Sequence, residues 1–406
     1  MAACGLSMDI DDLVNEDDRV GNRKVGMSQA KNTNVDIYGR SDAPDGLPPL
    51  SLPFVIVDEA CQSVEPATLI PLTASNSCRS LVLLGDPCQL PATVKSDTNS
   101  ELSVSLMERL ASTLPAPMIN MKNDAVEMDS TYLNSLPIKQ ARSLMRAREE
   151  NDKNPASYRK RFAGSLLLNV QYRMHPSIAA FSSSLFYDSL LQTPSFLASY
   201  RPFPEMLNQV MPCTNPSLGV RMIDIGGRCN EERGEVNKFT KTMFGSQASS
   251  STQESTTYRN EAEAVRVVTL VRDILKGICP DEPSSPKSIG IVTPYSGQVQ
   301  LIKSLIANDP EIVLMMKNPY ASVEVNSVDG YQGRERDIVI FSAVRSNRQG
   351  NVGFLSDWRR LNVALTRART ALVVVGDSDT LANGDKHWAA FQKWCEGAGC
   401  IVENKE

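Results

Sequence analysis

This sequence has few histidines, no closely paired cysteines and no long apolar run. It has only two histidines, and none of its nine cysteines forms a CxxC pair, so a zinc site is not expected. We expect reduced structural cysteines and a nuclear or cytoplasmic protein. The first ten residues lack the basic and apolar regions of a secretory signal, and no apolar run approaches the ~20 residues that span a bilayer. These absences predict a soluble protein with no membrane partner.

A strong charge of either sign is also missing. The formal net charge is −5, which gives no global electrostatic argument for binding nucleic acid. Any such surface is therefore predicted to be a local groove. The hydrophobic content of 41% is near the globular average, and 406 residues suffice for two or three domains.

The most informative absence is the phosphate-binding loop GxxxxGK[ST], which occurs nowhere in the sequence. Six other short segments of nucleotide chemistry are present, in one order. They are DEAC at 58–61, GDPCQL at 85–90, QYRMHP at 171–176, TPY at 293–295, DGYQGRE at 329–335 and NVALTRAR at 362–369. The sequence thus reads as most of an ATP-driven motor without the loop that holds its nucleotide.

Hydrophobic patterning predicts alternating strands and helices. Short apolar runs at 54–57, 81–84, 166–170, 219–224, 289–292, 323–326, 337–344 and 372–375 are predicted strands. Helices are predicted at 102–110, 261–274, 298–306 and 359–369. This alternation is typical of an α/β protein with mainly parallel sheets covered by helices.

Composition divides the chain into four parts. We expect an acidic, polar and disordered tail at 1–52, and a first domain at 53–164 with a polar, partly helical insertion at about 97–164. A second domain at 165–395, with a flexible loop at about 226–257, and a short tail at 396–406 complete the predicted organisation.

Acidic and polar residues follow two of the predicted strands. Asp58 and Glu59 end one strand, where carboxylates can hold magnesium and activate a water. Gln89 follows the next strand and could reach a terminal phosphate. Each feature alone also fits an ordinary solvated loop. Together they predict a polar rim at the carboxyl ends of neighbouring strands.

Three later segments add aromatic and cationic groups. Tyr172 can stack on a base and Arg173 can bind phosphate, whereas His175 before a proline is predicted to be structural. Arg367 and Arg369, on the predicted helix 359–369, could stabilise a transferring phosphoryl group, although a solvated basic face is the alternative. The glycines at 330 and 333 permit tight turns, and Gln332 and Glu335 could bind ribose or phosphate.

The full ordered set resembles the superfamily 1B helicases of the nonsense-mediated-decay and senataxin type. Residues 57–62 look like motif II, 84–90 like motif III, 171–176 like the QYRMHP signature, 328–335 like motif V and 361–369 like motif VI. The likeness covers about 53–96 and 165–395. It implies an AAA-type, RecA-like P-loop NTPase fold, with a first domain that is truncated before motif II and a complete second one.

This resemblance also implies roles for single residues, with ATP and Mg²⁺ as cofactors and single-stranded RNA or DNA as partner. Magnesium would be held by Asp58, and catalysis would use Glu59, Gln89, Arg173 and Arg367. The nucleotide would contact Tyr172, Glu335, Gly333 and Gln332. The strand would contact Thr293 and Pro294.

Two functions remain open at this point. The first is the C-terminal part of an ATP-dependent 5′-to-3′ helicase that is inactive by itself because its phosphate (Walker A) loop is absent. The second is a catalytically dead module that binds nucleic acid or a protein partner as a regulator or short isoform. The sequence does not distinguish RNA from DNA and identifies no protein partner.

Overall fold

The structure is a computed structural model that describes residues 3–9, 51–74, 77–94, 100–113, 118–119, 164–200, 204–226, 231–233, 257–279, 285–317 and 321–402. The chain forms two compact units. The N-terminal unit comprises Ala2–Pro87 and Pro91–Asn169, and the C-terminal unit comprises Cys88–Leu90 and Val170–Glu406.

The N-terminal unit is built on a mixed five-stranded sheet of order β2-β3-β1-β5-β4. Its strands are β1 (Ala3–Asp9), β2 (Phe54–Val57), β3 (Ser80–Gly85), β4 (Met118–Ile119) and β5 (Gly164–Leu168). The pairs β2–β3 and β4–β5 are parallel, whereas β1 runs antiparallel to both β3 and β5. The sequence predicted parallel strands, and the central strand β1 is the exception.

Helices of the N-terminal unit pack on one face of this sheet. They are η2 (Ala60–Gln62), α2 (Glu65–Thr73), η3 (Ser100–Ser103) and α3 (Leu106–Thr113). Side chains of β3 are alternately buried, so Leu81 and Leu83 reach a core that α3 completes with Leu106, Met107 and Leu110. This packing fixes β2 and β3, whose carboxyl ends carry Asp58 and Gly85.

The C-terminal unit has a five-stranded, fully parallel sheet of order β10-β9-β11-β12-β6. Its strands are β6 (Val220–Asp224), β9 (Ser288–Thr293), β10 (Ser322–Ser327), β11 (Arg336–Ser342) and β12 (Ala368–Gly376). A separate antiparallel ribbon joins β7 (Glu231–Arg233) to β8 (Tyr258–Asn260). The prediction of a parallel α/β sheet is confirmed for this unit.

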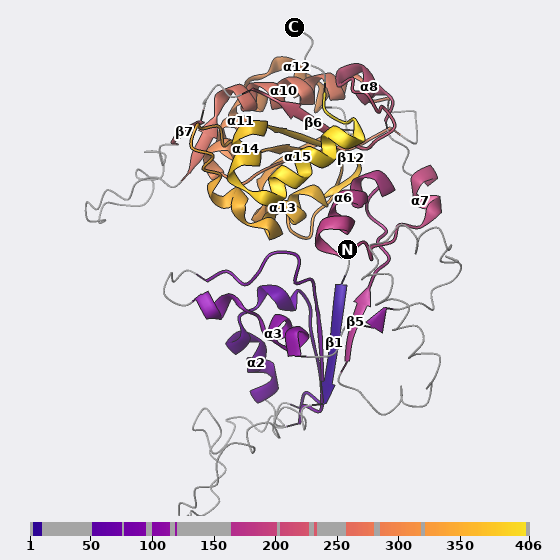
Figure 1. Ribbon diagram of the computed structural model, residues 1–406, viewed down its shortest axis with the longest axis vertical. Coiled ribbons are helices and arrows are strands. Elements are labelled where there is room, and N and C mark those ends of the chain that lie inside the picture. Colours follow the sequence, from indigo (N-terminus) through magenta and orange to yellow (C-terminus); the bar gives the residue numbers. More distant parts are fainter. Residues whose placement is uncertain are drawn as a thin grey trace, which may run out of the picture. The chain divides into compact units, whose positions relative to one another are not determined.

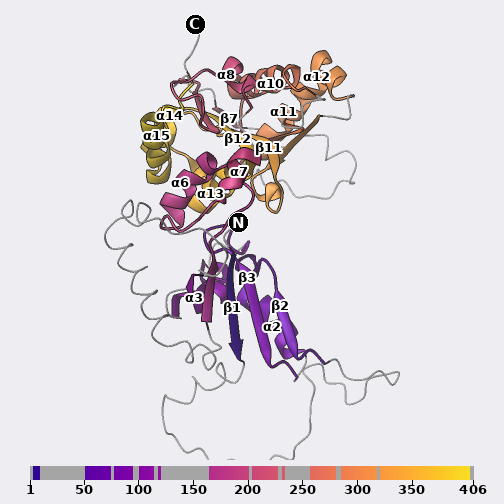
Figure 2. The ribbon, with the colours of Figure 1, turned by 90° about the vertical axis from the view of Figure 1, so that its right-hand side faces the viewer.

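Helices cover both faces of the parallel sheet (Figures 1 and 2). One face carries α8 (Met206–Val210), α10 (Glu261–Lys276), α11 (Ser296–Asn308) and α12 (Pro310–Met315). The other carries α6 (Pro176–Phe186), α13 (Trp358–Leu365), α14 (Ser378–Gly384) and α15 (Lys386–Ala398). Short helices η5 (Asp329–Tyr331), η6 (Gly353–Ser356) and α7 (Ser195–Tyr200) lie in the connections.

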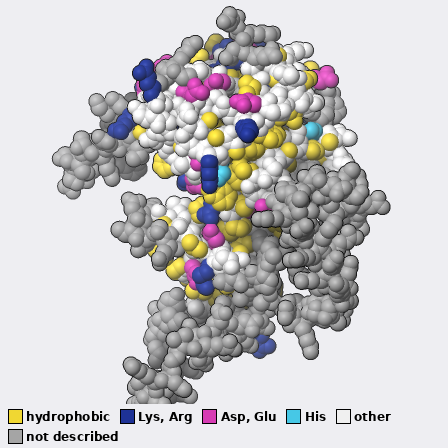
Figure 3. Space-filling view, viewed as in Figure 1, with side chains coloured by type: hydrophobic (Ala, Val, Ile, Leu, Met, Phe, Trp, Pro, Cys, Tyr) yellow, Lys and Arg dark blue, Asp and Glu magenta, His cyan; other side chains and the backbone are white. Residues whose placement is uncertain are grey.

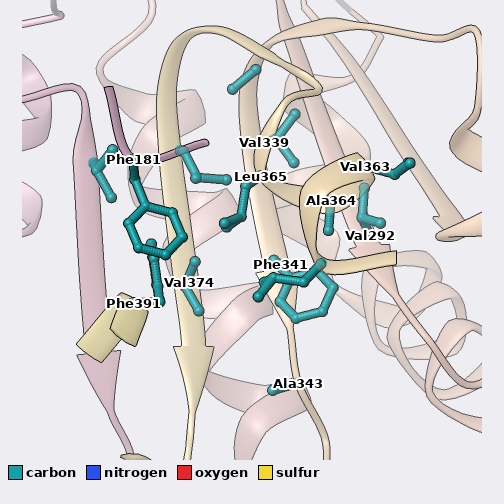
Figure 4. Close-up of a cluster of buried hydrophobic side chains, with 14 of the residues drawn as sticks. Phe181, Val292, Val339, Phe341, Ala343, Val363, Ala364, Leu365, Val374 and Phe391 are labelled. Carbon is teal, nitrogen blue, oxygen red and sulfur yellow. The ribbon is translucent and has the colours of Figure 1, made fainter. Parts of the chain in front are cut away.

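Strand alternation supplies a separate core to each face. In β11, Val339 and Phe341 point to the α6–α13–α15 face, while Ile338 and Ile340 point to the α10–α11 face. Figure 4 shows the first of these cores, with Phe181 of α6 beside Phe391 of α15 at 5.0 Å between ring centroids. Both faces are apolar, which explains the continuous hydrophobic runs in the sequence.

Four boundaries differ from the prediction. Residues 3–9, assigned to a disordered tail, form β1, because backbone pairing with β3 and β5 satisfies both edges of the strand. Residues 164–168 belong to the N-terminal sheet, so the second unit begins at Val170 rather than 165. Residues 10–50, 120–163 and 234–256, which include most of the predicted tail, insertion and loop, lie outside the described residues.

The other two differences lie near the C-terminus. Residues of the predicted tail 396–406 continue α15, and Val402 then donates its N–H to the Met222 carbonyl at 2.8 Å, which adds a bridge at the β6 edge. The predicted helix 359–369 ends at Leu365. Thr366 closes it by donating its N–H to the Asn362 carbonyl at 3.2 Å, and Ala368 already pairs in β12. In the described part of the chain, no helix is long and apolar enough to cross a membrane.

Candidate functional site

The acidic pair of the N-terminal unit lies directly after β2, as predicted. Asp58 and Glu59 are both exposed. Glu59 has a left-handed backbone with φ of 51°, which is uncommon for a residue with a side chain, and its N–H donates to Asp58 Oδ1 at 3.0 Å. Gln62 Nε2 donates to Glu59 Oε2 at 2.8 Å. Two solvent-facing carboxylates are therefore held side by side on a strained turn.

The segment after β3 leaves its own unit. Cys88–Leu90 packs with the C-terminal unit, where Leu90 joins the core and Gln89 is buried. Asn362 Nδ2 donates to the Cys88 carbonyl at 2.8 Å, and Arg367 donates from a terminal nitrogen to Gln89 Oε1 at 3.2 Å. The predicted phosphate-sensing glutamine thus contacts a predicted phosphate-binding arginine 278 residues later.

The QYRMHP segment forms a turn organised by a buried glutamine. Gln171 Oε1 accepts the N–H groups of Arg173 and Met174 at 3.0 and 2.8 Å. Its Nε2 donates to the Met174 carbonyl at 2.8 Å. The turn leaves the Tyr172 ring 56% exposed, so one aromatic face is available for stacking.

His175 has the structural role predicted for it. It is the N-cap residue of α6, and its Nδ1 accepts the Ser177 N–H at 3.3 Å. Its own N–H donates to the Arg369 carbonyl at 2.8 Å, which ties the turn to β12. Burial lowers the pKa of His175 and favours the neutral ring that a capping acceptor requires.

Glu335 lies between two arginines. Arg173 Nε donates to Oε2 at 2.5 Å, and Arg369 Nε donates to Oε1 at 2.9 Å. Burial alone would raise the pKa of Glu335, but hydrogen bonds from Arg173 and Arg369 outweigh it and lower the pKa to about 2. Glu335 is therefore a charged anchor for two cationic side chains.

Arg367 lies in the turn between α13 and β12, not on a helix face. Its side chain is fully buried, and Nε donates to the Val363 carbonyl at 2.9 Å. The alternative of a solvated basic face is therefore wrong for Arg367. Arg369 lies on β12, where it pairs with Glu335 and approaches Asp337 within 3.6 Å.

Thr366 connects these groups into one network. Its carbonyl accepts from Arg173 at 3.2 Å, and its hydroxyl oxygen accepts from Arg367 at 3.1 Å. We call this set the arginine network; its members are Gln89, Arg173, Glu335, Thr366, Arg367 and Arg369. Four short segments from distant parts of the sequence meet there.

The glycine loop after β10 is only partly engaged with this network. Tyr331 in η5 is fully buried, and burial raises its pKa. Gln332 has a buried Nε2 without a hydrogen-bond partner, so no protein group compensates the desolvation of this donor. Gly333 has φ of 72° and open space where a side chain would lie. The loop thus presents backbone and one amide beside Glu335.

The two residues predicted to contact a strand are covered. The Thr293 side chain is fully buried at the end of β9, and its Oγ1 has no hydrogen-bond partner. Pro294 is partly buried. The Thr293 hydroxyl therefore has no direct contact with solvent in this structure.

No sequence pattern points to a special role for one buried acid, Glu263. Its Oε2 accepts from the Ser342 hydroxyl and from the Val344 N–H, both at 2.6 Å. Burial, assisted by Asp377, raises the pKa of Glu263 to about 8 despite these hydrogen bonds. Its place three residues after the N-cap Asn260 looks like routine helix capping, which concealed its tertiary role.

Cationic side chains are dispersed over the described residues that are visible in Figure 3. On the side shown in Figure 3, Lys and Arg side chains lie singly among acidic, polar and hydrophobic ones. Among the residues that the structure describes, no three His, Cys, Asp or Glu side chains gather as a metal site.

Comparisons with known proteins agree with this geometry. Two family models described as AAA domains match residues 47–97 and 142–379. The second match covers more than half of the chain and contains nearly all of the arginine network. This chain belongs to the AAA-domain helicase family of the nonsense-mediated-decay and senataxin type.

Relatives of the family cover most of this chain. A regulator of nonsense transcripts 1 homolog from Neurospora crassa is 31% identical over 352 residues, 86% of this chain and 24% of that protein. Helicase sen1 of Schizosaccharomyces pombe is 31% identical over 337 residues, 83% of this chain and 15% of its own length. The DNA polymerase alpha-associated DNA helicase A of Saccharomyces cerevisiae is 28% identical, over 84% of this chain and 41% of that helicase.

This chain therefore spans less than half the length of these helicases. The first family match begins before motif II, and the second begins at 142, inside the predicted insertion 97–164. Residues 142–164 are thus part of the family pattern rather than an addition to it.

Proposed function

We propose that this chain is the part of an ATP-dependent 5′-to-3′ helicase that couples ATP hydrolysis to movement along single-stranded RNA or DNA. The observation that carries the proposal is the arginine network. It brings Gln89, Arg173 and Arg367, all assigned to catalysis from the sequence, into one hydrogen-bonded set. Arginines held this way suit the stabilisation of charge on a transferring phosphoryl group.

The side chains present fit ATP and magnesium. The exposed Asp58 carboxylate would hold the ion, which supplies charge neutralisation at the phosphates when bound. The neighbouring exposed Glu59 would orient and deprotonate the attacking water. Tyr172 would stack on the base, since its ring is open to solvent.

The glycine loop would hold the sugar and phosphates. Glu335 is already charged and paired with two arginines, and a carboxylate can still accept a ribose hydroxyl. The buried Nε2 of Gln332 is a donor without a partner, and the open backbone at Gly333 permits close approach. Both features support their assignment to nucleotide binding.

The kind of strand stays open in the proposal. The printed names of the relatives include a regulator of nonsense transcripts and a DNA helicase, so they do not favour one polymer. Backbone-tracking grooves read little sequence in any case. We propose a nuclear or cytoplasmic protein on the same grounds as the family assignment.

The 406 residues contain no GxxxxGK[ST] loop, so we propose that they hydrolyse ATP by themselves only at background. The test is phosphate release by the purified chain with and without poly(U) and oligo(dT), beside fluorescence anisotropy of strand binding. Strand binding without turnover is the expected result. Strand-stimulated turnover would contradict the inactivity, and absence of strand binding would contradict the helicase assignment.

The role of Glu59 is tested in any longer form with measurable turnover. Glu59→Gln removes the base while keeping the shape of the side chain, so turnover should fall by ~10²–10⁴-fold with ATP binding retained. Glu311→Gln, the same change at an exposed acid that pairs with Lys276, serves as the control and should retain most activity. Unchanged turnover in Glu59→Gln would remove Glu59 from catalysis.

The missing phosphate loop also supports a second candidate function, a catalytically inactive module that binds a strand or a protein partner. The genomic sequence upstream of the first codon separates the two. An in-frame strand followed by GxxxxGK[ST] would favour the motor, whereas a stop codon without such an exon would favour the binding module.

A further inference from the structure

A pocket of about 440 Å³ lies in the C-terminal unit away from the arginine network. Residues of β7, β8, the start of α11 and the segment from Arg345 to Arg360 line it. Its lining includes three aromatic residues, three arginines and one acid: Tyr258, Tyr295, Phe354, Arg233, Arg345, Arg360 and Asp357. This volume is in the range of small-molecule sites, roughly 300–1,000 Å³.

Three aromatic rings form one side of the pocket. Tyr295 is buried and contacts both other rings, with centroid distances of 5.4 Å to Tyr258 and 5.8 Å to Phe354. The Phe354 ring is 49% exposed. An aromatic residue that packs on a second ring and keeps half of its surface exposed is a platform on which a flat heterocycle can stack.

Arg345 packs against two of these rings and is held rigidly. Its Nε and one terminal nitrogen donate to Glu231 at 2.9 and 3.1 Å, and its guanidinium lies 4.3 Å from the Tyr258 centroid. A side chain at position 353 would lie 2.5 Å from the Arg345 guanidinium, so Gly353 permits this packing. Arg345 is thus held in one position, and Glu231 balances its charge.

The backbone before Arg345 is strained into place. Val344 has φ of 73°, a rare conformation for a β-branched residue. Its N–H donates to Glu263, and its carbonyl accepts from Asn260 Nδ2 at 3.0 Å. Strain that the surroundings hold in this way is concentrated at binding sites.

Cations at the rim supply the remaining feature. Arg360 lies 5.6 Å from the Phe354 centroid and is 29% exposed. It is paired with Asp329 at 3.2 Å and with Asp357 at 3.0 Å, so a phosphate would compete with these carboxylates. Arg233 is exposed on β7. Arginine beside an aromatic platform suits a base joined to a phosphate. The pocket also begins one residue after Pro294, where the sequence predicted a strand contact that Thr293 itself cannot make.

We propose that this pocket takes one nucleotide of a single strand, with its base stacked on Phe354 and its phosphate at Arg360 and Arg233. The inference rests on the proposed binding of single-stranded nucleic acid and adds a base-dependent contact to it. A strand held only through its backbone has no use for an open aromatic platform, whereas a base that enters the pocket does.

The test compares two oligonucleotides of equal length and charge, an oligo(U) and its fully abasic counterpart. Binding to the 406-residue chain is measured by fluorescence anisotropy. Phe354→Leu should weaken oligo(U) binding by about 5- to 100-fold, the range expected for one stacked base, and leave abasic binding unchanged. Phe196→Leu, on an exposed ring of α7 (58% exposed), should change neither affinity.

Arg360→Ala probes the phosphate end. It should weaken binding of both oligonucleotides and lower the slope of log affinity against log salt by about 1. Unchanged binding of both oligonucleotides by Phe354→Leu, or an equal loss for both, overturns the proposal. Tryptophan fluorescence checks folding, since all three tryptophans lie in the C-terminal unit at 358, 388 and 394.

Three outcomes distinguish a failure of the proposed function from a failure of the pocket inference. If the wild-type chain binds neither oligonucleotide, the proposed helicase function fails. If it binds both and Phe354 has no effect, only the pocket inference fails. If uridine monophosphate binds with Phe354 dependence while oligo(U) does not, the pocket takes a free nucleotide and its assignment to a strand is wrong.

Discussion

The two regions assigned to nucleotide chemistry occupy opposite environments. Asp58 and Glu59 in the N-terminal unit are exposed, on a turn held by a few local hydrogen bonds. The arginine network in the C-terminal unit is largely buried and joins residues up to 278 positions apart. The proposed roles fit this difference: a group that meets water and a cation would stay open, whereas arginines aimed at a phosphoryl group would be fixed by several partners.

This difference also separates stability from function. Replacing a residue of the arginine network should damage the fold, because each loss leaves buried polar groups without partners. Replacing an acid after β2 should damage activity and spare the fold. The predictions for Arg367 and Glu59 below test this contrast, and the one for Glu263 extends it to a buried acid outside the network.

The largest effect is expected for Arg367→Ala. The fully buried guanidinium donates to the Val363 carbonyl and to Gln89, so its removal should lower the free energy of unfolding by about 2–4 kcal/mol. Urea unfolding followed by tryptophan fluorescence measures this, because every tryptophan is in the C-terminal unit. Arg259→Ala, which breaks an exposed pair with Glu232, should cost less than about 1 kcal/mol. Equal costs would show that burial does not distinguish the two arginines.

A pH effect of intermediate size is expected from Glu263. Its folded pKa of about 8 exceeds the ordinary value of 4.5, so the folded state binds the proton more tightly. The free energy of unfolding should therefore fall as pH rises from about 4.5 to 8, by up to about 1.4 kcal/mol per pH unit. Below about pH 4.5 Glu263 is protonated in both the folded and the unfolded state, so the free energy of unfolding no longer changes with pH through this group.

Glu263→Gln removes this titration and keeps an oxygen that accepts from Ser342 and Val344. Urea unfolding at several pH values between 5 and 8 should give a flatter profile for this variant than for the wild type. Glu59→Gln is the matched control, because the exposed Glu59 should leave the profile unchanged. If the free energy of unfolding depends on pH in the same way in the wild type and in Glu263→Gln, the raised pKa of Glu263 is not the cause of the pH dependence.

The smallest effect, and one of opposite sign, is expected for Glu59→Gly. The left-handed backbone of Glu59 costs ~1–2 kcal/mol for a residue with a side chain, and glycine removes this cost. Part of the gain is lost again, because glycine makes the unfolded chain more flexible and so favours unfolding. The N-terminal unit should stay as stable or gain up to about 1 kcal/mol. Hydrogen exchange of a peptide spanning 54–62 measures it, with Asp58→Gly as a control that should exchange faster. Faster exchange in Glu59→Gly would mean that its side chain, not its backbone, holds the turn.

Most of the C-terminal unit was predictable because its signals are local. Apolar runs and helix periods placed β9, β10, β12, α10 and α11 within about two residues at most ends, apart from an earlier start of β12. The helix predicted through Arg369 failed because the apolar pattern continues beyond Leu365, whereas capping and strand pairing end the helix there. Strand β1 was missed because a lone strand in a polar context has little local signal.

The candidate site divides in the same way. Motif order identified the segments and the residues of the arginine network, since side-chain chemistry is written in the sequence. The links Gln89–Arg367 and Arg173–Glu335 depend on packing between segments far apart in the chain, and no periodicity encodes them. The burial of Thr293, the raised pKa of Glu263 and the aromatic pocket beside Tyr295 were invisible for the same reason.

The sequence by itself determined the family, the parallel α/β character and the kinds of side chain available for nucleotide chemistry. These properties follow from residue identity and short-range pattern. Only the tertiary structure decided which arginine meets which acid, which predicted contacts are buried, and where an aromatic platform is left open. Those outcomes depend on desolvation and on hydrogen bonds between distant segments, which exist only after the sheets and helices have packed.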